Sequence, residues 1–162
     1  MKYLFALLFF VLLMSVTSAQ NWKELNQAPI RLKYNIPQGW YVGGYIHGKA
    51  CNCNGATLNA SKDQTVNMVI LTDTTDLDTL KKQKVWGYSF APSSVYNEKL
   101  QTEFLTFEKA MSTWIEDTES AVLRFSTSHN ESQYLVYFWG NLQDITRNAN
   151  TIENILNSIQ GI

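Results

Sequence analysis

Two cysteines separated by one residue, Cys51 and Cys53, could carry chemistry, and they are the only cysteines of the chain. His47 lies shortly before them. One interpretation is a disulfide, which suits an exported chain with two cysteines; such a small ring would stiffen the loop more than it stabilises the domain. A second is a soft-metal site, because one imidazole and two thiolates suit Zn²⁺ or Cu(I), although no fourth ligand is identified. The third is a pair of free thiols.

An aromatic segment, residues 85–96, is a candidate binding surface. Loops on a rigid scaffold often carry function, and Trp and Tyr are favoured anchors of binding sites. The alternative, in which these rings cap the edge of a sheet, remains open. The candidate ligand-binding residues are Trp86, Tyr88, Phe90 and Tyr96.

Catalytic templates are absent from the sequence. It contains no Gly-x-Ser-x-Gly elbow, no His-Glu-x-x-His, no phosphate-binding glycine loop and no Cys-x-x-Cys. His129 and the acidic residues Glu116, Asp117 and Glu119 fall in polar stretches, where solvent exposure explains them. We therefore expect a non-enzymatic protein with no catalytic residues and no cofactor.

The charge pattern limits the classes of partner. The formal net charge is −1, and lysines and arginines are scattered along the chain. Nucleic acids and anionic membrane surfaces are bound through clustered positive charge, so neither is an expected partner. We expect instead a monomer that binds a protein or a small molecule.

The N-terminal residues 1–19 have the organisation of a signal peptide. Lys2 precedes an apolar run, Tyr3–Met14, and the small residues Ser18 and Ala19 form a cleavage site before Gln20. The run of about a dozen residues is short for a membrane span, which needs roughly 20. We predict cleavage after Ala19 and a mature chain, residues 20–162, that forms one domain in the extracytoplasmic space without a membrane span.

The remaining periodicities predict a mostly antiparallel sheet followed by a helix. Alternation of Ile30, Leu32, Tyr34 and Ile36 predicts a strand that Pro37 ends, with Trp40 folding back over its apolar face. Residues 21–27 are expected to be irregular or briefly helical. Further strands are expected from Trp40 onward with a bulge at Gly43-Gly44, and at 56–61, 66–72, 103–107, 110–115, 120–127 and 133–139. The pattern predicts a turn at Glu108-Lys109, with a helix at 97–111 as the alternative for this region. It also predicts a hairpin turn at 129–132 and helices at 73–84 and 148–161.

Three short segments resemble the PsbP-like family, which includes the Mog-type Ran-binding proteins and exported bacterial relatives. They are Tyr34–Trp40, the turn Ala60–Asp63 before the strand Val66–Leu71, and Ile155–Ile159. The resemblance implies the α+β class, with a central antiparallel sheet flanked by helices in an α-β-α sandwich. It also implies an accessory binding module without catalytic residues. The loop with Cys51 and Cys53 is not part of the family pattern, so the alternative function, redox or metal handling through these residues and His47, would be particular to this chain.

Overall fold

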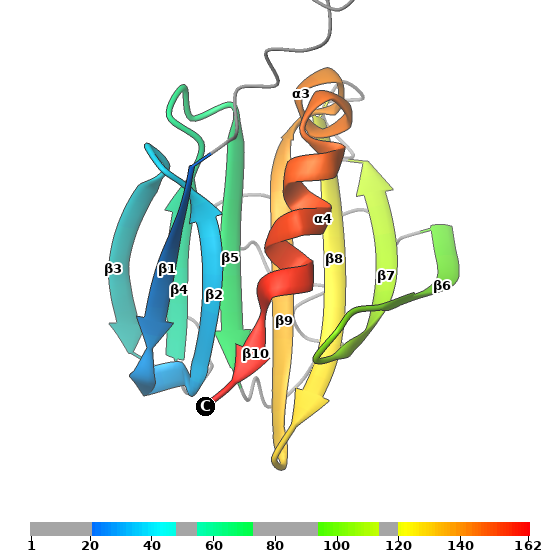
Figure 1. Cartoon of the computed structure of the whole chain (residues 1–162). Helices are drawn as coiled ribbons and strands as arrows, with labels where there is room; N and C mark the ends of the chain where they lie inside the picture. Colours follow the sequence, from blue (N-terminus) through cyan, green and yellow to red (C-terminus); the bar gives the residue numbers. More distant parts are fainter. Residues whose placement is uncertain (1–20, 48–54, 73–93, 114–119) are drawn as a thin grey trace, which may run out of the picture.

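A computed structural model of the chain describes residues 21–47, 55–72, 94–113 and 120–162 (Figure 1). Seven strands form one antiparallel sheet in the order β3-β4-β5-β9-β8-β7-β6. The edges are therefore β3 and β6. The strands are β3 (Tyr41–His47), β4 (Gly55–Ala60), β5 (Val66–Thr72), β6 (Ser94–Gln101), β7 (Thr106–Thr113), β8 (Ser120–His129) and β9 (Ser132–Asn141).

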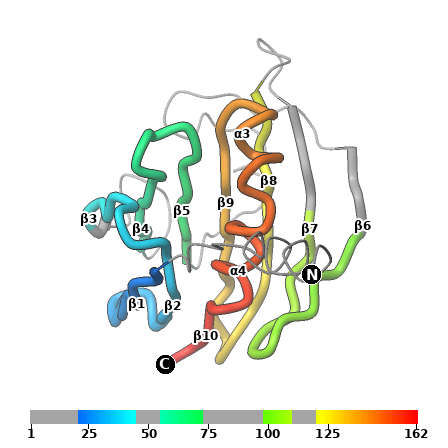
Figure 2. Tube along the Cα trace, turned by 45° about the horizontal axis from the view of Figure 1, so that its top comes forward, coloured from blue at the N-terminus to red at the C-terminus, as the bar shows by residue number. Residues whose placement is uncertain are grey.

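A second layer covers one face of this large sheet. It contains a three-stranded sheet, in the order β1-β2-β10, and two helices. Its elements are β1 (Trp22–Gln27), the short 3-10 helix η1 (Ala28–Ile30), β2 (Leu32–Pro37), α3 (Leu142–Arg147), α4 (Ala149–Ser158) and β10 (Gln160–Gly161). Figure 1 shows the small sheet and α4 side by side in front of the large sheet, and Figure 2 shows α3 and α4 over β8 and β9. No helix in the described ranges is long and apolar enough to cross a membrane.

The main core lies between these two layers. Alternate residues of β5 and β9, such as Met68 and Phe138, point into it, because side chains of a strand alternate between the two faces. Three phenylalanines from β7, β8 and β9 meet edge to face, with ring centroids 6.4 and 6.1 Å apart. The helix α4 contributes Ile152, Ile155 and Leu156, which form the buried apolar stripe of the helix.

The other face of the large sheet carries a second, smaller apolar cluster. Its buried members are Ala56, Val69, Leu71, Val122, Leu135 and Tyr137. These residues alternate in sequence with residues of the main core, as Val69 does with Met68 and Ile70. The large sheet is therefore apolar on both faces along β5 and β9, which explains the continuous burial of β5 from Met68 to Thr72.

The antiparallel sheet, the strand at 66–72 and the hairpin with its turn at 129–132 are confirmed. Trp40 packs, partly buried, against the main core, as expected. The pairing of β3 with β4 shifts register between Val42 and Tyr45, which confirms an irregularity at the two glycines. The α+β class is likewise confirmed, whereas the small three-stranded sheet was not predicted. The predicted helix 73–84, on which a second helical layer depends, lies outside the described residues.

Three sequence-based predictions are wrong. Residues 22–27 form the strand β1 and are not irregular or helical; the only buried side chain of this strand, Leu25, lies opposite Tyr34 of β2. Strand β7 runs straight through Glu108 and Lys109, so no turn is present there and the separate strands 103–107 and 110–115 are not formed; the chain turns at residues 102–105 instead. The helix predicted at 148–161 is present as α4, but its predicted end is wrong, because the chain leaves the helix after Ser158 and forms β10. The preceding helix α3 was not predicted.

Candidate functional site

Most of the site residues predicted from the sequence cannot be placed. Those outside the described residues are Cys51, Cys53, Trp86, Tyr88 and Phe90. The backbone of His47 ends β3 opposite Gly55, and Tyr96 belongs to β6, but the side chains of His47 and Tyr96 also lie outside the description. The described residues contain no group of three or more His, Cys, Asp or Glu that could hold a metal ion. The disulfide, the metal site and the aromatic surface therefore stay predictions.

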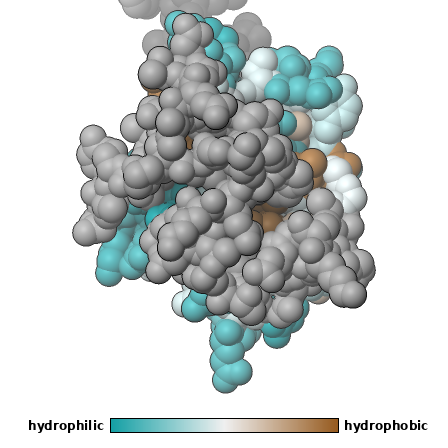
Figure 3. Space-filling model, turned by 180° about the vertical axis from the view of Figure 1, so that it is seen from behind, coloured by the Kyte–Doolittle hydropathy of each residue, from teal (hydrophilic) through white to brown (hydrophobic). Residues whose placement is uncertain are grey.

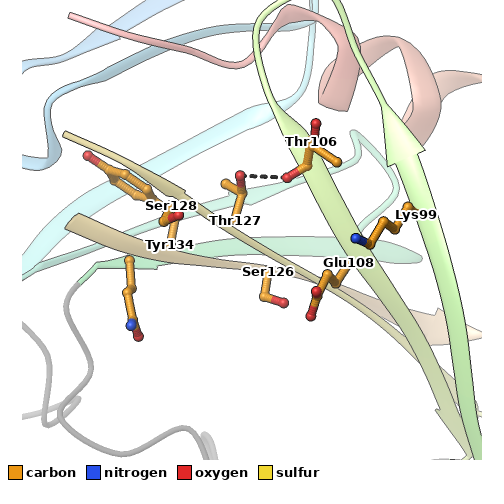
Figure 4. Close-up of a pocket in the computed structure, with 8 residues that line it drawn as sticks. Lys99, Thr106, Glu108, Ser126, Thr127, Ser128 and Tyr134 are labelled. Atoms are coloured by element: carbon orange, nitrogen blue, oxygen red, sulfur yellow. Dashed lines mark hydrogen bonds between the residues drawn. The ribbon is translucent and has the colours of Figure 1, made fainter. Parts of the chain in front are cut away.

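A polar hollow, which the sequence did not reveal, lies across strands β6, β7 and β8. Lys99 of β6 is the cross-strand partner of Glu108 of β7, and Glu108 is the partner of Ser126 of β8. Partners directly opposite in an antiparallel sheet project to the same face, so these three side chains form one row. Figure 4 shows their polar ends directed toward one another.

The hollow has a volume of about 300 Å³ and a lining that is rich in hydroxyl groups. It is placed between the turn that joins β6 to β7 and the turn that joins β8 to β9, because its residues come from the strand ends next to both turns. Ser128 and its cross-strand partner Gln133 extend the row toward the second turn. The lining residues are Lys99, Thr106, Glu108, Ser126, Thr127, Ser128, Gln133 and Tyr134.

Some of the lining groups already have partners within the fold. The hydroxyl of Thr127 donates to the carbonyl oxygen of Thr106 at 2.8 Å, and that of Thr106 donates to Gln101 Oε1 at 2.6 Å. Among the described residues, the side chains of Lys99, Glu108 and Ser126 form no hydrogen bond or ion pair with one another. An ammonium group, a carboxylate and a hydroxyl are thus available to a bound molecule.

Two adjacent cross-strand pairs of β6 and β7 project to opposite faces of the large sheet. Glu98 pairs with Lys109, whose Nζ lies 3.0 Å from Glu98 Oε2, while the next rung pairs Lys99 with Glu108. Because successive side chains of a strand alternate between the two faces, the pair Glu98–Lys109 faces the helix α4 and the pair Lys99–Glu108 faces the polar hollow. A turn at Glu108-Lys109 would have placed both side chains in solvent, so the wrong turn prediction concealed the hollow.

The row that crosses the hollow continues into the second apolar cluster. From Ser126 the ladder passes to Leu135 of β9 and then to Leu71 of β5, both buried. Figure 3 views this face of the molecule, where most of the coloured residues in sight are hydrophilic and a smaller group is hydrophobic. The hollow is therefore the polar side of a face whose centre is apolar.

The described lining of the hollow offers groups of both charges together with several hydroxyl groups, and it contains no histidine or cysteine. Glu108 and Lys99 carry opposite charges at neutral pH and offer a recognition pair for a ligand with both donor and acceptor groups.

No family model matches this chain, and no curated protein matches its sequence. Solved structures do match. Cyanobacterial PsbP from Synechocystis sp. PCC 6803 superimposes with a TM-score of 0.62 at 9% identity, over 91% of this chain and 96% of the PsbP chain. A protein of Bacteroides thetaiotaomicron VPI-5482 gives a TM-score of 0.58 at 10% identity, over 86% of this chain and 48% of the other. The yeast Ran-binding protein Mog1p gives a TM-score of 0.47 at 7% identity, over 88% of this chain and 96% of its own.

The fold and the likeness to PsbP define the class of protein. In its described residues the chain is an α+β protein with a seven-stranded antiparallel sheet, a small second sheet and two C-terminal helices. More narrowly, it has the PsbP-like fold, as the three sequence segments indicated.

Proposed function

We propose that this chain is an exported, non-enzymatic binding domain and that the polar hollow on β6, β7 and β8 is its ligand site. The observation that carries the proposal is the convergence of Lys99, Glu108 and Ser126 in one cross-strand row without partners among themselves. Export is supported by the signal-peptide organisation of residues 1–19, and an accessory role by the PsbP-like fold.

The chemistry of the row selects the kind of ligand. Lys99 offers three donors and a positive charge, Glu108 offers acceptors and a negative charge, and Ser126 can both donate and accept. A small zwitterion, with a carboxylate for Lys99 and an ammonium group for Glu108, satisfies both charges at once. The volume of about 300 Å³ lies at the small end of known ligand sites, so the ligand is of amino-acid size.

The test is a titration of the ¹⁵N-labelled protein with each of the common free amino acids, followed by amide chemical shifts. We expect at least one of them to shift the amides of Lys99, Glu108 and Ser126. Glu108→Gln and Lys99→Met should each weaken that binding about tenfold or more, since a hydrogen bond to a charged group contributes roughly 1.5–3 kcal/mol.

The matched control is Glu103→Gln, which removes an exposed carboxylate from the β6–β7 turn outside the lining of the hollow. This variant should bind as the parent protein does. A titration in which no amino acid moves the three amides, or in which the Glu108 and Lys99 variants bind normally, would refute the proposed site.

A further inference from the structure

A second hollow, the α4 pocket, lies on the helix-bearing face of the large sheet. Its volume is about 260 Å³, and it opens between α4 and the strands β6, β7 and β8. The residues of β6, β7 and β8 that line it alternate along these strands with residues that line the polar hollow. The two sites therefore share three strands and lie on opposite faces of the sheet. The lining residues are Glu98, Leu100, Lys109, Leu123, Phe125, Ala149, Ile152, Glu153 and Leu156.

The floor of the α4 pocket is the edge of the main core. Phe125, Ile152 and Leu156 are buried, whereas Leu100 and Leu123 are half-buried and pack against the same cluster. The pocket therefore presents apolar surface to water between α4 and β8. An aliphatic group bound there would remove that surface from water, which is a favourable change.

The rim of the α4 pocket carries one carboxylate in excess. Lys109 is engaged by Glu98 at 3.0 Å, with 35% and 62% of the two side chains exposed. Glu153, on the opposite wall formed by α4, is exposed and forms no ion pair with any described residue. An anionic head group would meet this unpaired carboxylate and be repelled, whereas a cationic one would be attracted.

We propose that the α4 pocket binds a small amphiphile with one aliphatic chain and a primary amine as its head group. The chain would lie on Leu100, Leu123 and Leu156, and the ammonium group would donate to Glu153 at the rim. At about 30 Å³ for each water-sized group, the pocket holds roughly nine non-hydrogen atoms, which is the size of octylamine. This site is independent of the polar hollow and takes a ligand of different chemistry.

The experiment compares three probes of equal chain length, each below its micellar concentration: octylamine, octanoate and octyl glucoside. Binding to the full protein at pH 7 is measured by calorimetry and by amide shifts in the ¹⁵N-labelled protein. Octylamine is protonated at this pH, since alkylammonium groups titrate near the pKa of lysine, about 10.4. We expect octylamine to bind most tightly, to shift Leu100, Leu123 and Leu156, and to exceed octanoate in affinity at least tenfold.

Two pairs of variants distinguish binding in the α4 pocket from non-specific binding to the protein surface. Ala149→Trp places a large ring at the mouth and should abolish binding, whereas Asn150→Trp, on the next exposed residue and outside the lining, should leave it intact. Glu153→Gln should lower the preference for octylamine over octanoate, whereas Glu24→Gln, an exposed carboxylate on β1, should not. Equal affinity for octylamine and octanoate, or unchanged binding in Ala149→Trp, would overturn the assignment.

Discussion

At the scale of residues, a repeated Glu-Lys pair contributes charged side chains to both hollows. Glu98-Lys99 and Glu108-Lys109 lie on neighbouring antiparallel strands, and the register pairs each glutamate with the lysine of the other strand. Opposite charges directly across a sheet are favourable, so the pairing stabilises this register against a slip of one residue. The two pairs are visible in the sequence. Their register is not, because it depends on where the turn at 102–105 is made.

A buried tyrosine connects the two sheets at the same scale. The hydroxyl of Tyr34 accepts a hydrogen bond from Asn59 Nδ2 at 2.9 Å and lies 3.1 Å from Thr57 Oγ1. Burial raises the pKa of Tyr34, and the hydrogen bonds with Thr57 and Asn59 oppose that rise. Tyr34 was predicted from alternation as a core residue. The polar residues on β4 that receive its hydroxyl were not predicted, because nothing local marks Thr57 and Asn59 as buried.

Gly140 on β9 is required by a close approach of two backbones. A Cβ added there would overlap the carbonyl oxygen of Thr65, which precedes β5 and cannot move without disturbing the central ladder. We expect Gly140→Ala to lower the free energy of unfolding by about 1–3 kcal/mol, as overpacking does in other proteins. Urea denaturation followed by tryptophan fluorescence measures the change. Gly44→Ala is the matched control, since a Cβ at Gly44 has no neighbour within 4 Å, and equal losses in both variants would contradict this explanation.

At the scale of elements, the strands that were predicted correctly are those with strong local patterns. The β-branched run of β5 and the long β8–β9 hairpin need no tertiary information to be recognised. β1 was missed because it is an edge strand with one buried residue, Leu25, and so shows no alternation. β10 consists of Gln160 and Gly161 only, and its pairing with β2 depends on the place where α4 ends.

The side chain of Ser158 links the end of α4 to β2, next to the backbone pairing between β10 and β2. β10 pairs with Lys33 and Leu32, and beyond this pairing the backbone N–H of Asn35 donates to Ser158 Oγ at 2.8 Å. The same hydroxyl donates to the carbonyl oxygen of Ile155 at 2.6 Å. One serine therefore satisfies a strand donor and closes the last turn of the helix.

Ser158→Ala should reduce the free energy of unfolding by about 1–2 kcal/mol, because the N–H of Asn35 loses its partner in a half-buried place. Urea denaturation gives the size of the loss, and hydrogen exchange at Asn35 should become faster in the variant. Asn157→Ala is the control, since Asn157 is equally half-buried on the same helix turn. If Asn35 exchanges at the same rate in Ser158→Ala as in the parent, the hydroxyl does not hold this donor.

At the scale of the whole molecule, one sheet presents different chemistry on its two sides. The strands β6, β7 and β8 carry the polar hollow on one face and the α4 pocket on the other, while β5 and β9 are apolar on both. The PsbP-like fold could be predicted from three short segments of the sequence, whereas β1, β10 and the turn between β6 and β7 could not. The sequence was insufficient for the sites, because each is assembled from several elements of the fold and no single segment of the sequence marks it.

The second apolar cluster makes the stability of the whole molecule sensitive to alkali. Burial raises the pKa of Tyr137 to about 12, and the positive charge of Arg124 opposes this only in part. In the unfolded chain tyrosine titrates near pH 10, so above that pH the unfolded state loses a proton that the native state retains. Stability should therefore be constant with respect to this group below pH 9 and should decline from pH 10 to 12, by roughly 2–3 kcal/mol in total. Tyr34, whose pKa is also raised, acts in the same direction.

Urea unfolding at pH 8 and pH 11 measures this decline, and Tyr137→Phe should make it smaller because phenylalanine has no proton to lose. The comparison uses the difference between the two pH values within each variant, so that any effect of the substitution on packing cancels. Tyr41→Phe is the control, since the Tyr41 side chain is 54% exposed on the edge strand β3. Its decline should equal that of the parent protein. A decline that is the same in all three proteins would mean that Tyr137 ionises in the native state as readily as in the unfolded chain, and that the second cluster does not exclude water from it.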